Sequence, residues 1–310
     1  MMVRTRAITS LASVIALGLC SWAQADELPV LKGPYLGQQP PGQTPEVFAP
    51  SIISTPAPEG SSWFSEDGRL FLFTRGRSAV NGILLMEEVS GVWSEPRLAP
   101  FSAGQHDWDF VLAPDGKTVF LASGRPAHSG EPAPRDHSIW MSRRTAQGWS
   151  EPERLPRPVN VGQHDSFPSV AADGTLYFFS GRDGGLGQGD IYRSRPVRGR
   201  YLEVENLGAP VNSASHEVDP FIAPDESYLI FCSDRPGGHG KDDMYIVFAK
   251  AGGGWTAPVN MGETVNSPHQ EYIPSVSRDG KYFFFTTNKF GNRDIYWMDA
   301  SMIERLRPRR

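Results

Sequence analysis

Five acidic residues occupy equivalent positions in five similar stretches of the chain. Each lies eight residues before an aspartate in a predicted tight turn, and the five acids are Glu59, Asp107, Asp165, Glu217 and Glu271. A histidine directly precedes three of them, at His106, His164 and His216. Imidazole and carboxylate groups together suit Mn²⁺, Zn²⁺ or Ca²⁺, so these pairs are candidates for a cation or polar-ligand site.

A structural role explains the same acids without a ligand. Four of the stretches place an arginine at the end of a predicted strand that follows the acid, at Arg75, Arg125, Arg182 and Arg235, and the fifth has Lys289 instead. The acids can pair with these arginines or accept hydrogen bonds from backbone N–H groups. We favour this role, because a feature present in every repeat usually stabilises the repeat.

The histidines are more informative, because they break the symmetry of the repeats. Only the second to fourth repeats carry the histidine in register, and His269 in the fifth is offset by one position. A site would therefore lie off the axis, on the side of these repeats. We predict no cofactor; if a metal binds, His106, His164 and His216 are its candidate ligands and Mn²⁺ or Ca²⁺ the candidate ions.

The turn aspartates divide the chain into five units. They recur at intervals of 48 to 58 residues, at Asp67, Asp115, Asp173, Asp225 and Asp279. Each unit has a short first strand, a strongly apolar second strand and a third strand, followed by a fourth segment in the first four units. Repeats of this length that contain only strand patterns predict a β-propeller. We place the repeats at about 59–105, 106–163, 164–215, 216–268 and 269–310.

The two ends of the repeat array complement each other. Residues 46–54, EVFAPSIIS, resemble a fourth segment without a repeat of their own, and the last repeat stops after its third strand. Pairing them would close the ring and remove two exposed sheet edges. We therefore predict one all-β domain over residues 46–310, a five-bladed propeller of four-stranded blades. A six-bladed ring is the alternative, and it would need residues 26–45 to contribute.

The first strand of a propeller blade lines the central channel. The histidine and acid pairs are therefore expected to form a ring around one mouth of that channel. The ligand-binding candidates at the mouth are His106, Asp107, His164, Asp165, His216, Glu217 and Glu271, and the turn aspartates with Arg125, Arg182 and Arg235 are structural candidates.

Four segments carry a resemblance to a known repeat family. They are LAPDGKTVFLASGR, SVAADGTLYFFSGRDGGLGQGDIY, IAPDESYLIFCSDRPGGHGKDDMY and VSRDGKYFFFTTNKFGNRDIY, and they resemble the Pro-Asp type of WD-like propeller repeat of TolB-like periplasmic proteins. The resemblance covers essentially residues 46–300, although only Pro114 and Pro224 precede their turn aspartates and Glu226 replaces a turn glycine. It implies the propeller fold and a periplasmic location but leaves the activity open.

The N-terminus has the layout of a secretory signal. Arg4 and Arg6 precede an apolar run over residues 7–19, and Ala23-Gln24-Ala25 supplies small residues for cleavage near Ala25. We predict a signal peptide over residues 1–25 and a periplasmic or secreted protein. A lipoprotein anchored through Cys20 is less favoured, because the preceding leucine is large for a lipobox. Residues 26–45, rich in Pro, Gly and Gln, should form an extended tail.

Composition narrows the class of partner. A net charge of −5 and a pI near 5.8 argue against nucleic acid, which needs a basic surface. The apolar run at the N-terminus is too short to span a bilayer, so no membrane span is expected. Cys232 is the one cysteine after the predicted cleavage site, and in the apolar strand YLIFC it is expected to be a small buried hydrophobe.

Two glycine-rich loops, at residues 184–190 and 237–243, are further candidates. The second fits the GGxGxDxU pattern of calcium-binding β-rolls, but those need tandem copies, and a hairpin turn is the better interpretation. In the stretch 216–247 that contains this loop, comparison with the other repeats leaves Asp219, Cys232 and His239 as particular to this copy.

Taken together, the sequence favours an exported, non-catalytic binding or scaffold propeller, expected to be a monomer. Its expected partner is an envelope protein, a peptidoglycan-associated molecule or a carbohydrate. The alternative is a carbohydrate-active enzyme with its site at the channel mouth, either a metal-dependent lyase or a five-bladed glycosidase that uses two carboxylates. The sequence has neither a nucleophile elbow nor a phosphate-binding loop.

Overall fold

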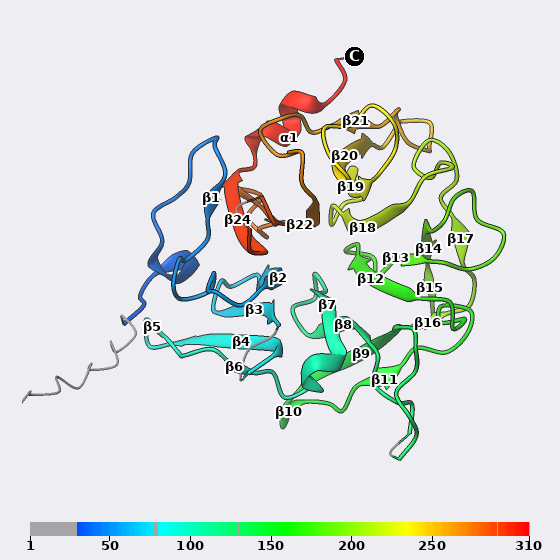
Figure 1. Ribbon diagram of the computed structural model, residues 1–310. Helices are drawn as coiled ribbons and strands as arrows, with labels where there is room; N and C mark the ends of the chain where they lie inside the picture. The colour runs from blue at the N-terminus through cyan, green and yellow to red at the C-terminus, as the bar shows by residue number, and fades with distance from the viewer. Residues whose placement is uncertain (1–29, 77–79, 129, 290, 310) are drawn as a thin grey trace, which may run out of the picture.

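The computed structural model describes residues 30–76, 80–128, 130–289 and 291–309. Within this part of the chain, five antiparallel sheets are arranged radially around a central axis (Figure 1). The predicted five-bladed propeller of four-stranded blades is thereby confirmed. The predicted signal peptide and Cys20 lie outside the described residues, and no described helix has the length and apolar character needed to cross a bilayer.

Each blade has three long strands and a short fourth strand, numbered from the axis outward. Blade 1 contains β2 (Glu59–Phe64), β3 (Leu70–Arg75), β4 (Gly82–Val89) and β6 (Arg97–Leu98). Blade 2 contains β7 (Asp107–Leu112), β8 (Thr118–Ser123), β9 (Ser138–Thr145) and β11 (Glu153–Arg154). Blade 3 contains β12 (Asp165–Val170), β13 (Leu176–Ser180), β14 (Asp190–Ser194) and β17 (Glu205–Asn206).

The last two blades follow the same plan. Blade 4 contains β18 (Glu217–Ile222), β19 (Tyr228–Ser233), β20 (Asp243–Phe248) and β21 (Val259–Asn260). Blade 5 contains β22 (Glu271–Val276), β23 (Tyr282–Thr287), β24 (Asp294–Asp299) and the N-terminal β1 (Glu46–Val47). Short elements outside this plan are β5 (Val92–Trp93), β10 (Gly148–Trp149), β15 (Pro196–Val197), β16 (Arg200–Tyr201), η1 (Pro34–Gly37), η2 (Gly104–His106) and α1 (Ser301–Leu306).

The second strands form the centre of each blade, and their sequences explain why. All six residues of β8 are buried, as are all five of β13, because neighbouring blades cover both faces of the sheet. The turns that precede these strands use the aspartates predicted from the repeat. In each, the carboxylate accepts the backbone N–H two residues later, and the five aspartates are Asp67, Asp115, Asp173, Asp225 and Asp279.

The ring closes as predicted, through an N-terminal strand in the last blade. β1 pairs antiparallel with β24, with Glu46 opposite Trp297 and Val47 opposite Tyr296. The strand is shorter than the predicted segment 46–54, because the backbone turns at Ala49, where φ is 43°. Next to β1, Phe48 is fully buried among aromatic side chains of blades 1 and 5. Pairing with β1 covers the edge of β24 that would otherwise be open.

The region before β1 is packed against the propeller, which corrects the expectation of an extended tail for these residues. The Tyr35 ring lies 4.9 Å from Phe64 of blade 1 and 4.8 Å from Tyr282 of blade 5. Leu36 is 1% exposed. Two adjacent apolar side chains within the Pro- and Gly-rich segment thus cover the junction of the first and last blades.

A repeated asparagine, which the sequence reasoning did not identify, joins each of three blades to the linker that follows it. In each case the side-chain Oδ1 accepts the N–H of a third-strand residue and Nδ2 donates to the carbonyl of the same residue. The three pairs are Asn160 with Ile139, Asn212 with Ile191, and Asn266 with Met244. Each of the three asparagines follows a valine, but Val-Asn also occurs at positions 80 and 259, so the dipeptide alone does not identify them.

Candidate functional site

The repeated acids are buried within their own blades. All five carboxylates are 0% exposed, and four form an ion pair with an arginine at N–O distances of 2.7 to 3.1 Å. The pairs are Glu59 with Arg75, Asp107 with Arg125, Asp165 with Arg182, and Glu217 with Arg235. This is the structural arrangement that the repeat pattern favoured.

Each pair also ties a blade to the linker that precedes it. Arg235 donates to the carbonyl of Val211 at 2.7 Å and stacks over the rings of Phe231 and Tyr245. Glu217 accepts from the N–H and hydroxyl of Ser213. In the fifth blade, Glu271 instead accepts from the hydroxyls of Ser267 and Thr287, and burial raises the pKa of its carboxyl.

The predicted histidines do not converge as a group. His164 and His216 lie on either side of Phe179, at ring distances of 5.7 and 5.2 Å, and both border the central cavity. His106 is not part of the cavity wall. The His164 ring lies 5.2 Å from His137, which the sequence reasoning did not single out. Within the described residues, no three His, Cys, Asp or Glu side chains gather in a way that could hold a metal ion.

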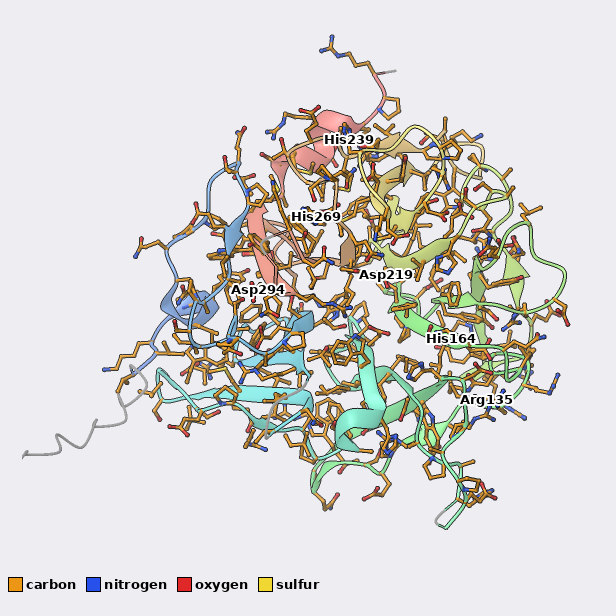
Figure 2. All side chains as sticks on the ribbon, in the orientation of Figure 1. Arg135, His164, Asp219, His239, His269 and Asp294 are labelled. Atoms are coloured by element: carbon orange, nitrogen blue, oxygen red, sulfur yellow. The ribbon has the colours of Figure 1, made fainter. Side chains whose placement is uncertain are left out.

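The glycine-rich loops are held by the aspartates that follow them. Asp190 accepts the N–H groups of Leu186 and Gly187, and Asp243 accepts the corresponding N–H groups in the second loop. These carboxylates therefore serve the hairpins. His239 and His269 are exposed, and Figure 2 shows His239 on the outer side of the ring near α1.

A second column of residues, two positions after the buried acids, faces the channel. Every first strand has a β-bulge at this point, where its pairing with the second strand shifts register. Bulges redirect side chains and are common beside functional sites. The residues at these positions, blade by blade, are Ser61, Asp109, Phe167, Asp219 and Ile273. All except Ser61 line a single cavity.

This cavity has a volume of about 480 Å³ and lies on the axis, where the first strands begin. Arg293 of blade 5 spans it, with its guanidinium 5.4 Å from the Trp108 ring of blade 2 and 4.7 Å from the Tyr272 ring of blade 5. Blades 2 and 5 are not neighbours in the ring, so a contact between them crosses the axis. Figure 2 places Asp219 beside this central opening.

The other end of the channel is closed by side chains. Arg278 of blade 5 donates to the carbonyl of Leu112 of blade 2 and lies 5.5 Å from the Trp63 ring of blade 1. Trp63 in turn packs 5.9 Å from Phe221 of blade 4. The contacts of Arg278 with Leu112 and of Trp63 with Phe221 join blades that are not neighbours, so these side chains form a plug across the axis. The cavity above them is therefore blind.

Asp109 and Asp219 are the unusual groups of the cavity. They are 6% and 4% exposed, and the Oδ1 atom of each is buried without a hydrogen-bond partner. The Oδ2 atom of Asp219 accepts the N–H of Ile273 at 3.1 Å. Unpaired buried carboxyl oxygens are costly, and native proteins retain few of them. Asp219 also adopts a φ of 54°, in the left-handed region, where non-glycine residues are strained.

Burial dominates the protonation of both groups. It raises the pKa of Asp219 to about 7, although Arg293 and the N–H of Ile273 oppose the shift. The pKa of Asp109 is raised well above its usual range, first by burial and then by the charge of Asp219. Near neutral pH the pair therefore holds protons that ordinary aspartates have lost. Two such carboxyls can donate and accept hydrogen bonds to a ligand, or act as acid and base.

Comparison with known proteins gives the fold but not a family. No family model matches the sequence, and no curated protein matches it. Among solved structures, putative TolB from Agrobacterium tumefaciens has a TM-score of 0.50 and 16% identity, covering 81% of this chain and 80% of that one. TolB from Acinetobacter baumannii has a TM-score of 0.52 and 15% identity, covering 81% and 54%. An alpha-L-arabinofuranosidase from Lactobacillus brevis has a TM-score of 0.50 and 12% identity, covering 80% and 92%.

The chain shares a β-propeller fold with these proteins. At such identities the similarity concerns the fold alone.

Sequence reasoning found half of the central pair. The sequence comparison identified Asp219 as particular to its repeat, but it did not identify Asp109. The comparison rested on the position that is acidic in all five repeats, and Asp109 lies two residues after that position. The column two positions later is acidic in only two. That break in symmetry was the available signal, since an acid absent from most blades is not required to build a blade.

Proposed function

We propose that this protein binds a carbohydrate in its blind central cavity and acts outside the cytoplasm as a non-catalytic binding protein. The observation that supports this is the pair of buried carboxyl groups of Asp109 and Asp219, two residues that line the cavity and whose Oδ1 atoms have no hydrogen-bond partner. A ligand that supplies hydrogen-bond donors there would offset the cost of leaving these oxygens unpaired.

The remaining wall suits a sugar. Trp108, Phe167 and Tyr272 provide aromatic surface, while Gln270 and Arg293 add polar groups. A ring with apolar faces and hydroxyl edges matches such a mixture, and a volume of about 480 Å³ lies within the usual range for small-molecule sites. One of the solved structures with this fold is an arabinofuranosidase, so a sugar ligand is compatible with the architecture.

The proposed location rests on the N-terminal sequence and on the resemblance of the repeats to TolB-like proteins. A positively charged start, a short apolar run and a small-residue cleavage motif predict export. In the cell envelope, the sugar can be free or part of a peptidoglycan-associated polymer. The acidic net charge suits a partner without phosphate groups.

Isothermal titration of the protein from residue 26 onward tests the proposal. The panel would contain cellobiose, xylobiose, arabinobiose and the disaccharide of N-acetylglucosamine. We expect at least one sugar to bind, with affinity reduced tenfold or more in the double variant Asp109→Asn/Asp219→Asn. Asp225→Asn, in a turn outside the cavity, is the matched control and should bind as the parent does. Binding that is equal in all three proteins would refute the assignment of the site.

Glycoside hydrolysis is the second candidate, favoured by the raised pKa values of Asp109 and Asp219. Two carboxyls with raised pKa values, one from blade 2 and one from blade 4, could serve as general acid and general base. Release of nitrophenol from aryl glycosides, or of reducing ends from oligosaccharides, tests it. Turnover that either single Asp→Asn variant reduces at least 100-fold would support it, and turnover no faster than the buffer blank would exclude it.

A further inference from the structure

Carboxyl groups outnumber basic side chains of the guanidinium or ammonium type among the described lining residues of the cavity. Four carboxyl groups border it, and among the described lining residues Arg293 supplies the one guanidinium or ammonium group. The carboxyl groups belong to Asp109, Asp219, Asp242 and Glu271. Glu271 is engaged by Ser267 and Thr287, and Asp242 accepts from the side-chain amide of Gln270. Asp109 and Asp219, whose Oδ1 atoms are buried without a hydrogen-bond partner, are therefore the carboxyl groups to which a ligand could donate.

Arg293 does not satisfy them. Its guanidinium stacks between the rings of Trp108 and Tyr272. Its charge lowers the pKa of both aspartates, so it acts on them through space, but it forms no ion pair with either within the described structure. The cavity thus has room for a second cationic group, between two carboxyls that need donors.

We infer that the ligand is an amino sugar, whose protonated amino group binds between Asp109 and Asp219. This inference rests on the proposed carbohydrate-binding function. An ammonium group has three donors, so a single group can donate to both carboxyls, whereas a hydroxyl has one donor. Hydrogen bonds between ionised partners are also about twice as strong as those between neutral groups.

The surroundings of the two aspartates favour an ammonium group over a metal ion. No third His, Cys, Asp or Glu in the described structure completes a ligand set with them. The ring of Phe167 and the aromatic pair around Arg293 line the same cavity, and aromatic faces stabilise organic cations. An ammonium group needs neither the ligand number nor the fixed geometry of a metal.

Binding of this kind is coupled to proton release. Both carboxyls hold protons more tightly than exposed aspartates do, and a cation binds their ionised forms. Amino-sugar binding should therefore expel protons into the buffer, and its affinity should rise as the pH increases from 5 to 7 while the amine stays charged. A neutral sugar hydrogen-bonded to the protonated carboxyls should expel few or none.

Three disaccharides that differ only at carbon 2 test the inference by titration calorimetry at pH 6.5. They are the β-1,4 disaccharides of glucosamine, N-acetylglucosamine and glucose, which carry an ammonium, an acetamide and a hydroxyl group. We expect the ammonium form to bind at least tenfold more tightly than the other two. Its heat of binding should vary with the ionisation enthalpy of the buffer, which reports proton release. Asp219→Asn and Asp109→Asn should each abolish the preference, and the turn variant Asp225→Asn should keep it.

The outcomes separate this inference from the proposed function. If the acetamide or hydroxyl form binds as tightly as the ammonium form, the amino-sugar inference is overturned and carbohydrate binding stands. A preference for the ammonium form that survives both Asp→Asn substitutions would overturn the assigned position of the amine. If none of the three binds and the neutral panel also fails, both proposals are wrong.

Discussion

Replacing Asp219 by asparagine should stabilise the protein above pH 7. Asparagine has nearly the same shape, tolerates the left-handed backbone at this position, and its side-chain oxygen can still accept the N–H of Ile273. The substitution therefore removes the titrating carboxyl group while keeping the shape of the side chain and the hydrogen bond from Ile273. It thus separates the cost of an unpaired buried carboxylate from every other contact of β18.

The size of the effect follows from the pKa. Burial raises the pKa of Asp219 from 3.8 to about 7. Because the folded-state pKa is the higher one, the stability associated with this proton is fully present below about pH 4 and is lost as the pH rises through 7. The pKa difference corresponds to about 4 kcal/mol at most. The variant does not titrate here, so its advantage should be smaller at pH 4.5, at about 1 kcal/mol or less, than at pH 8, where the upper limit is about 4 kcal/mol.

Urea unfolding followed by circular dichroism at pH 4.5 and pH 8 measures this difference. Asp165→Asn is the matched control, because Asp165 is also fully buried but is paired with Arg182 at 3.1 Å. It should destabilise the fold by about 3 to 5 kcal/mol at pH 8, since it leaves a guanidinium that is only 14% exposed without its counter-ion. An Asp219→Asn variant that is less stable than the parent at pH 8, or equally stabilised at both pH values, would refute the reasoning.

Three further predictions concern the framework around the site. Arg235→Ala should lower the free energy of unfolding, measured in urea, by about 3 to 5 kcal/mol, because it breaks the ion pair with the buried carboxylate of Glu217. Arg97→Ala breaks an exposed ion pair and should lower it by about 1 kcal/mol or less. Equal losses in the two variants would contradict this reasoning. Asn212→Ala removes two buried hydrogen bonds and one partly buried one and should lower the unfolding free energy by about 2 to 4 kcal/mol. A loss below about 0.5 kcal/mol would show that these bonds contribute little. Arg278→Ala removes the donor to Leu112 and opens the plug, so acrylamide should quench tryptophan fluorescence more efficiently than in the parent, and unchanged quenching would argue against a closed end.

The local features of the blades could be predicted because each is encoded within one repeat. Asp67 and its counterparts form turns through their own backbone neighbours, and each arginine that pairs with a repeated acid lies at the end of the second strand of the same blade or two residues beyond it. The packing of Leu36 could not be predicted, because its partners lie in blades at the two ends of the chain. The Val-Asn dipeptide was visible in the sequence, but its meaning depends on the third strand that precedes it.

The sequence by itself determined five blades, their closure by an N-terminal strand and the structural pairing of most of the repeated acids, since these depend on patterns that recur at one spacing. The tertiary structure decided the site. Asp109 and Asp219 belong to blades that are not neighbours, and they meet because the ring closes and a bulge in each first strand turns the side chain toward the axis. Side chains from several blades surround a carboxyl group at the axis, and together they determine whether it has a hydrogen-bond or ion-pair partner. The sequence of a single repeat therefore does not contain that information.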